Sequence, residues 1–414
     1  MVKSELAKTY VPVLFEDESS CCGCGACAAK CPKNAISMVE DAGGFVYPSI
    51  NSDLCVGCGL CVKSCGFQHQ IGKETQGPFF AAAGKGDVAK SASGGVFASL
   101  AKEFILNGGV AYGAAYSPKG SGLAVRHQRA SSLEELEPLL NSKYVQSDAG
   151  CCFQELQKDL KEGLSVLFCG TPCQVAGLRG FLGRDWQSLH TVDLVCHGVP
   201  SEKMFSECVE AYANRYGSPV IDFRFRCKRH GWGHSLLLLL LLGDHREIEI
   251  PANECSYYDM FLKLKTLRVS CYNCPYACGY RVGDFTIGDF WGIETNRPDV
   301  LRDERKFNQS KGISCLLVNT EHGKGFLDST DSLYLSQVEF NDIAKGNDQL
   351  RHPSVLPKDR QLYIDEFSVG GWNAVERLYK RREYGAAFHL KRIIKTVLPK
   401  SMVRFIKGLI AQYF

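Results

Sequence analysis

The 414-residue sequence predicts an α+β protein made of a cysteine-rich N-terminal domain, a mixed α/β body and a C-terminal helical tail. Three observations lead to this fold class. Nine of the 21 cysteines fall between Cys21 and Cys65. Apolar segments of strand length then alternate with amphipathic segments of helical length, which is typical of α/β organisation. From Arg377 onward the chain is basic, with Glu383 as the only acidic residue, and apolar residues recur at helical spacing.

The N-terminal cysteines form two copies of one motif. The copies are Cys21-x2-Cys24-x2-Cys27-x3-Cys31 and Cys55-x2-Cys58-x2-Cys61-x3-Cys65. This is the bacterial two-cluster ferredoxin pattern, in which the fourth cysteine of each copy binds the cluster of the other copy. We therefore expect two 4Fe–4S clusters. Their ligands are a first cysteine set, Cys21, Cys24, Cys27 and Cys65, and a second cysteine set, Cys31, Cys55, Cys58 and Cys61.

Zinc is the alternative metal for these cysteines, but zinc sites usually pair two short motifs and do not use four cysteines in one tight run. Glycines between the ligands fit close approach of the backbone to a cluster. Cys22 lies outside the pattern and is interpreted as a bystander. The repeat thus predicts a two-cluster ferredoxin-like domain over residues 1–72.

The body begins after a polar linker, residues 72–78. Its expected strands are 79–83, 110–116, 165–169 and 189–195, and its expected helices are 96–106, 133–140 and 153–161. Ligands in such folds usually bind at the carboxyl ends of strands. Residues 220–225 predict a further strand, and the seven leucines of 236–242 predict a strand buried on both faces, paired in a hairpin with 246–250. Seven residues are too few to span a bilayer.

A second cysteine constellation, Cys271-x2-Cys274-x3-Cys278, supplies three thiols in one turn-rich segment. A third 4Fe–4S cluster there needs one distant partner. Cys196 and Cys173 are both candidates, because each follows a predicted strand. The alternative is that these cysteines are small buried apolar residues, and spacing alone leaves the two interpretations open.

Several segments in the same order resemble the coenzyme F-420 hydrogenase/dehydrogenase beta-subunit family. They are Ser93-Gly-Gly95, Ser142-Lys-Tyr144, Gly170-Thr-Pro-Cys-Gln174, Asp193-Leu-Val-Cys-His-Gly198, Cys271–Cys278 and Gly288-Asp-Phe-Trp-Gly292. The resemblance covers roughly residues 79–330. It implies an N-terminal-type domain over 78–165 and a C-terminal-type domain with the cysteine cluster over 166–330, followed by a helical extension, residues 331–414.

The resemblance implies an FAD-binding iron–sulfur flavoprotein. Members include subunits that reduce coenzyme F-420 and the plant 7-hydroxymethyl chlorophyll a reductase, so the substrate stays open. Similar chains also occur among bacterial surface-polysaccharide genes. We expect a cytoplasmic oxidoreductase of an anaerobic host, which takes electrons from ferredoxin or a redox partner subunit and passes them through FAD to a small-molecule substrate. The alternative within redox chemistry is a non-catalytic electron-transfer subunit.

The expected flavin contacts come from glycine-rich turns and cations. Ser93, Gly94 and Gly95 open a helix, and Gly170 and Thr171 follow a strand, so either turn could offer backbone N–H groups to a pyrophosphate; an ordinary tight turn is the alternative for both. Lys143 and Arg281 could offset phosphate charge, or be surface cations. His197 is the candidate proton donor, or a structural histidine. The basic loop 226–230 either meets an anionic substrate or is a solvated turn.

The net charge of the chain bears on which partners are expected. Lysines and arginines exceed acidic residues by 48 − 45 = 3, so nucleic acid is not expected as a partner, and a zinc-binding interaction or nucleic-acid module is disfavoured. The basic amphipathic tail could lie on the inner face of an anionic membrane or dock on the body or a partner, and docking is the preferred interpretation.

Overall fold

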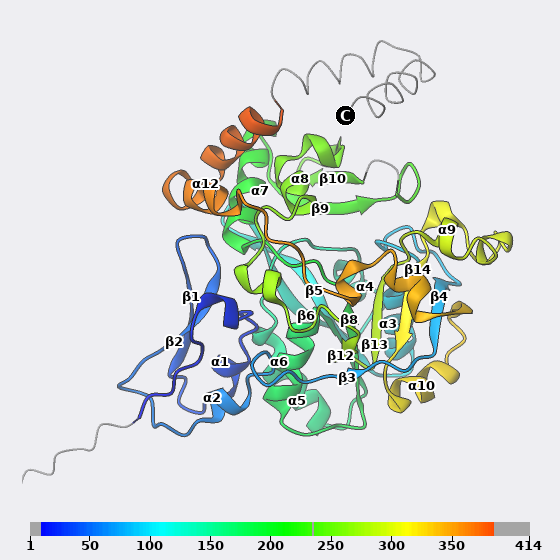
Figure 1. Ribbon diagram of the computed structural model, residues 1–414, viewed down its shortest axis with the longest axis horizontal. Coiled ribbons are helices and arrows are strands. Elements are labelled where there is room, and N and C mark those ends of the chain that lie inside the picture. Colours follow the sequence, from blue (N-terminus) through cyan, green and yellow to red (C-terminus); the bar gives the residue numbers. More distant parts are fainter. Residues whose placement is uncertain (1–9, 234–235, 385–414) are drawn as a thin grey trace, which may run out of the picture.

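The body is built on one mixed sheet of eight strands in the computed structural model, which describes residues 10–233 and 236–384 (Figure 1). The strand order is β15-β4-β14-β13-β8-β7-β5-β6. The strands are β4 (Phe79–Gly84), β5 (Val110–Lys119), β6 (Gly122–Ala130), β7 (Val166–Gly170), β8 (Leu189–Leu194), β13 (Phe285–Asp289), β14 (Ser314–Val318) and β15 (Leu333–Val338). Strands β5, β7, β8 and β13 run parallel, and their other neighbours pair antiparallel. The predicted mixed α/β body is therefore confirmed.

Helices cover both faces of this sheet. The helices are α3 (Val96–Leu106), α4 (Leu133–Leu136), α5 (Phe153–Lys161), α6 (Pro172–Leu182) and α10 (Glu321–Asp328). Strand β7 shows the two faces, because Leu167 packs in the core with α3 and α10, whereas Val166 and Phe168 pack in the core with α5 and α6. Helices α3 and α5 have the predicted bounds.

A second, three-stranded antiparallel sheet lies beyond the carboxyl ends of the parallel strands (Figure 1). It consists of β9 (Val220–Cys227), β10 (Leu237–Leu242) and β11 (Glu247–Ile250), packed with α7 (Glu202–Tyr216), α8 (Ser256–Leu262) and α12 (Arg360–Glu383). The predicted hairpin and the burial of the leucine strand are confirmed, since five of its six residues are buried.

The N-terminal domain, blue in Figure 1, lies against α5 and α6. Its elements are α1 (Ala26–Lys30), β1 (Ile36–Glu40), β2 (Val46–Ile50) and α2 (Leu60–Lys63). The backbones meet closely here: a Cβ on Gly66 would come within 2.3 Å of the Ala176 carbonyl oxygen in α6. This contact explains why glycine follows Cys65 where proline follows Cys31.

Three expectations change. The predicted linker contains β3 (Lys73–Glu74), which pairs with β12 (Tyr280–Arg281). The predicted boundary at 165/166 lies inside one sheet, because β4, β5 and β6 join β7 and the later strands. The predicted helical extension from 331 begins with a strand, because β15 pairs along β4 before α11 (Phe340–Ala344) and α12 begin. A short helix, α9 (Ile293–Asn296), follows β13.

The tail expectation concerns residues that fall mostly beyond the described part of the chain. Helix α12 ends at Glu383, and the basic amphipathic segment from 385 to 414 lies outside the described residues. Among the described residues, none of the helices is both long and apolar enough to cross a membrane.

Candidate redox site

The first cysteine set is assembled in the N-terminal domain on the side that faces the body. Burial raises the pKa of Cys21 to about 11, and the nearby Cys24 and Cys65 add to the increase. Burial also raises the pKa of Cys27, and Cys24, Cys21 and Cys65 again act on it. These mutual electrostatic effects indicate that the four thiols lie near one another, and their joint binding of one cluster stays a prediction.

The second cysteine set lines one small cavity, with all four thiols around it. The cavity is lined by Cys31, Cys55, Cys58 and Cys61 together with apolar residues such as Ile36 and Ile50. Cys61 is buried, whereas Cys58 is exposed. The exposed apolar side chains of Leu54, Val56 and Leu60 belong to the same stretch of chain. This site therefore lies near the surface.

Both sets fit iron–sulfur clusters by their donor chemistry. Each offers four cysteines, and the cysteines of the described residues are free rather than paired in disulfides. Backbone N–H groups already point at ligand sulfurs: Gly23 donates to Cys21 Sγ over 3.4 Å, and Ala35 donates to Cys31 Sγ over 3.3 Å. Such N–H···S bonds stabilise thiolates and tune cluster potentials.

A further group of four thiols, the third cysteine set, meets in the body. Its members are Cys173, Cys196, Cys271 and Cys274. Cys173 opens α6 directly after β7, Cys196 follows β8, and the other two lie on or beside the 3-10 helix Val269–Asn273. Burial raises the pKa of Cys196, and Cys271, Cys173 and Cys274 all add to that effect. Both sequence candidates for the distant partner are thus present together.

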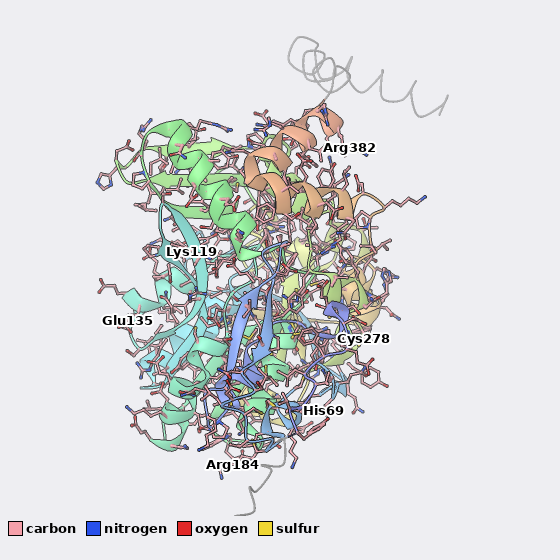
Figure 2. All side chains as sticks on the ribbon, turned by 90° about the vertical axis from the view of Figure 1, so that its left-hand side faces the viewer. His69, Lys119, Glu135, Arg184, Cys278 and Arg382 are labelled. Atoms are coloured by element: carbon pink, nitrogen blue, oxygen red, sulfur yellow. The ribbon has the colours of Figure 1, made fainter. Side chains whose placement is uncertain are left out.

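Cys278 lies apart from this set. Its thiol donates to the Pro275 carbonyl at 3.3 Å and lies 3.8 Å from the Tyr280 carbonyl. It is not among the groups that act on the other thiols of the constellation. Figure 2 shows Cys278 on the opposite side of the view from Lys119 and Glu135. Here the Cys278 thiol bonds local carbonyls, and its role as a ligand stays a prediction.

One glycine makes the third set sterically feasible. Gly198 has a φ of 125°, and a Cβ there would come within 2.8 Å of the Cys271 Cβ. Only a residue without a side chain lets the loop after β8 approach Cys271 this closely.

Cys22, interpreted from the sequence as a bystander, connects the first and third sets. Hydrogen bonding to Cys173 and to Cys24, followed by burial, raises the pKa of Cys22 well above its usual value. The same bond from Cys22 lowers the pKa of Cys173 to about 7. The sequence carried no signal for this role, because Cys22 is outside the repeat and its partner lies in another domain.

A cleft of about 800 Å³ lies in the body, beside β9. Its size is in the range of sites for cofactors. It is lined from the 86–90 loop, the 137–143 segment, β9 and the loop after it, and residues 310–311. Apolar walls come from side chains such as Tyr116, Leu140 and Phe223. The predicted residue Lys143 and the basic-loop residue Lys228 both line it.

Within the described residues neither lysine forms an ion pair, although the Asp222 carboxylate acts on Lys143, and Asp289 and Asp87 act on Lys228, from a greater distance. Lys143 Nζ donates to the carbonyls of Pro138 at 2.8 Å and Leu140 at 2.6 Å, and burial lowers the pKa of Lys143 to about 7. Lys228 Nζ donates to the carbonyls of Ser93 and Lys311, both at 2.8 Å, and burial lowers its pKa to about 8. The cleft therefore offers two poorly solvated ammonium groups to an anionic ligand.

The glycine turn at 93–95 has a structural role that its sequence did not reveal. Ser93 Oγ donates to the Ile313 carbonyl and the Gly94 N–H donates to Ser314 Oγ, both over 3.0 Å. Gly95 has a φ of 82° and precedes α3. The turn anchors α3 to the start of β14, so Ser93 and Gly94 do not offer these donors to a pyrophosphate as predicted.

Gly170 and Thr171 lie at the start of α6. The Thr171 N–H donates to Gln174 Oε1 over 3.0 Å and caps α6, and Thr171 Oγ1 lies 3.2 Å from Cys173 Sγ. A Cβ on Gly170 would meet this same Gln174 side chain at 3.2 Å. The Thr171 N–H is thus already bonded within the helix cap, and a phosphate contact of this turn stays a prediction.

Arg281 is also withdrawn from ligand binding. Its guanidinium pairs with Asp193 at 2.6 Å and also bonds Thr286 Oγ1 and the carbonyls of Tyr276, Cys278 and Leu194. It is buried with its carboxylate partner. The predicted charge offset for a phosphate is therefore replaced by a structural ion pair that ties β12 to β8.

His197 lies in the loop that follows β8. It directly follows Cys196, and its ring is accessible to solvent although protein surrounds the site. Burial lowers its pKa, while Asp289 opposes this effect. Asp289 forms an ion pair of 3.0 Å with Arg226 and also acts to raise the pKa of Lys228 in the cleft.

The ferredoxin-type domain, the mixed α/β body and the cysteine sets define an iron–sulfur protein of the oxidoreductase type. Residues 163–342 match the family model for the C terminus of the coenzyme F420 hydrogenase/dehydrogenase beta subunit, and residues 20–68 match that of the 4Fe-4S dicluster domain. The chain therefore resembles this family over residues 163–342, which is less than half of its length, and it has a 4Fe-4S-type domain at residues 20–68.

Individual relatives add less. No curated protein matches the chain. A solved structure titled as a xenon derivative of the F420-reducing NiFe hydrogenase complex from Methanosarcina barkeri is 17% identical; the alignment covers 77% of this chain and 95% of that one. Its TM-score of 0.44 is too low to support an argument about fold or function.

Proposed function

We propose that this chain is an iron–sulfur flavoprotein oxidoreductase that passes electrons from its ferredoxin-type clusters through FAD to a small molecule that accepts a hydride. A coenzyme F-420-like deazaflavin is the substrate class suggested by the family, and an unidentified metabolite is the other. The proposed ligands of a third 4Fe–4S cluster are Cys173, Cys196, Cys271 and Cys274. This revises the predicted set by keeping both distant cysteines and dropping Cys278.

The observation that carries the proposal is that one chain combines the two cysteine sets of its ferredoxin-type domain with a third cysteine set and a cofactor-sized cleft in its body. The second set lies near the surface at Cys58, the first set follows within the same domain, and Cys22 contacts both Cys24 and Cys173. In the body, His197 directly follows Cys196 in the chain. A donor such as reduced ferredoxin or a partner subunit would meet the exposed second set first.

The cleft residues fit FAD by charge and size. A bound flavin supplies exchange of electrons singly or in pairs, which joins cluster chemistry to hydride chemistry. Lys143 and Lys228 would hold the anionic pyrophosphate. The apolar walls would exclude water from the ring system.

His197 and Asp289 are the residues proposed to handle the proton. The pKa of His197 is lowered by burial, so at neutral pH its ring is mainly neutral and can accept or donate a proton through its accessible nitrogen atoms. Asp289 is held in place by Arg226 and by the Trp232 indole, which donates to Asp289 Oδ1 over 3.2 Å.

The test is anaerobic purification followed by quantification of iron, sulfide and flavin. The proposal expects about twelve irons, four per cluster, and one FAD per chain. About eight irons with FAD would contradict the third cluster. Eight irons without flavin would contradict the flavoprotein and leave the alternative, an electron-transfer subunit that serves a separate enzyme. Bleaching of coenzyme F-420 by the protein with reduced ferredoxin would distinguish an enzyme from such a carrier.

A further inference from the structure

Arg268 is among the largest fully buried side chains of the described residues, and none of its surface is exposed. Its guanidinium donates to the Cys21 carbonyl at 2.8 Å, to Gln146 Oε1 at 3.1 Å and to the Val46 carbonyl at 3.0 Å. Within the described residues, these partners are all neutral and none is a carboxylate. A buried cation with only neutral partners is strongly disfavoured unless an anion compensates it.

The surroundings of Arg268 indicate which anion is expected. On one side its Nε bonds Cys21, a ligand of the first set. On the other side its backbone carbonyl accepts the N–H of Cys271, and its own N–H donates to the Val199 carbonyl, three residues after Cys196. Arg268 therefore stands between the first and third cysteine sets.

We propose that Arg268 is the shared counter-cation of the first and third iron–sulfur sites and raises the reduction potentials of both. For the third site this rests on the proposed function; for the first it rests on the dicluster domain alone. A cluster with four thiolate ligands is an anion, and reduction adds a further negative charge. A buried positive charge nearby stabilises the reduced form more than the oxidised form.

A purely structural role is the competing explanation. Arg268 joins Cys21 and Val46 of the N-terminal domain to Gln146 of the body, and its guanidinium lies 4.1 Å from the centre of the Tyr47 ring. Removing it could loosen the interface without any electrostatic effect. The conservative variant Arg268→Lys keeps the charge but not the three-way hydrogen bonding, so it separates the two roles.

The experiment is a potentiometric titration followed by electron paramagnetic resonance on full-length Arg268→Gln, Arg268→Lys and wild-type protein, each with its iron content measured. At a fixed potential, Arg268→Gln is expected to lower the reduced-to-oxidised ratio of the first and third clusters about tenfold, which for one electron equals about 59 mV. The second cluster serves as the internal reference and is expected to stay unchanged. Arg268→Lys is expected to titrate near wild type.

Two results would overturn the proposal: Arg268→Gln with full iron content and unchanged potentials, or Arg268→Lys shifted as far as Arg268→Gln. Should Arg268→Gln not assemble, Gln146→Glu places a carboxylate next to the guanidinium with little change of shape, and the same fall at both clusters is expected. Unchanged potentials in this variant would also refute the proposal. A wild-type protein without a third cluster would contradict the proposed function, while the shift at the first cluster would still decide the role of Arg268.

Discussion

The two regions that carry cysteine sets are built on different principles. In the N-terminal domain, eight thiols are spaced by short turns between Cys21 and Cys65, so each ligand is fixed by its neighbours in the sequence. In the body, the third set comes from three separate segments that the sheet brings together. The comparison teaches that local spacing encodes a local site, whereas a site at strand ends is encoded by topology.

The topology of the third set follows from β7 and β8. These strands are parallel neighbours, and their carboxyl ends deliver Cys173 and Cys196 to the same edge of the sheet. The 3-10 helix with Cys271 follows α8 in the chain, and the absence of a side chain at Gly198 leaves space for Cys271. The spacing of the cysteines in the sequence does not predict that these three segments meet.

The largest expected effect tests this difference directly. Replacing Cys196 with serine is expected to remove one cluster, or about four of twelve irons per chain, because cluster irons need thiolate ligands. The two clusters of the N-terminal domain are expected to remain. Iron and sulfide counts with electron paramagnetic resonance of the reduced protein measure this.

Cys278→Ser is the matched control, since it changes the same atom in the same cysteine constellation. It is expected to keep all twelve irons, about four per cluster, because the Cys278 thiol bonds only local carbonyls. Loss of four irons in Cys278→Ser would restore Cys278 to the ligand set predicted from spacing, and an intact Cys196→Ser would then leave Cys173 as the distant partner.

The same contrast explains how much the sequence predicted. The first two cysteine sets, α3, α5 and the leucine hairpin were predicted because each depends on short-range periodicity or spacing. Strand β15 was missed, because its place depends on pairing with β4, which is remote in the sequence.

The flavin contacts were the least predictable part of the site. A glycine turn before a helix has the same sequence whether it binds phosphate or anchors a helix, and Gly94 is used for anchoring. Arg281 could not be distinguished from a free cation, because its partner Asp193 lies on another strand. Lys143 was identified and lies in the cleft, but its lack of an ion pair within the described residues is visible only in the structure.

The second prediction concerns the body and tests whether Lys143 in its cleft binds FAD. Its pKa is lowered to about 7, so the cation predominates below that pH and is lost as the pH rises through it. FAD affinity of deflavinated protein is therefore expected to fall between about pH 6 and pH 9. Lys143→Met is expected to weaken binding at pH 6 roughly tenfold to a hundredfold, the range for a charge-assisted hydrogen bond. Fluorescence titration at each pH measures this.

Lys90 provides the control, because it lines the same cleft but is exposed and paired with Glu137. Lys90→Met is expected to leave FAD binding within about twofold of wild type, because exposed pairs contribute little. Equal FAD affinity of Lys143→Met and wild type at pH 6 would show that the flavin does not use this cation.

The smallest expected effect concerns the joint between the two regions. Lys119, labelled in Figure 2, reaches from the end of β5 to Glu202 of α7 at 2.9 Å and to Glu40 of β1 at 3.5 Å. Its side chain is 39% exposed, so solvent screens both pairs and each contributes at most about 1 kcal/mol. Lys119→Ala is therefore expected to speed hydrogen exchange of the β1 and β2 amides less than about fivefold. A much larger increase would mean that the exposed pairs, and not the buried contacts at Arg268 and Gly66, hold the N-terminal domain on the body.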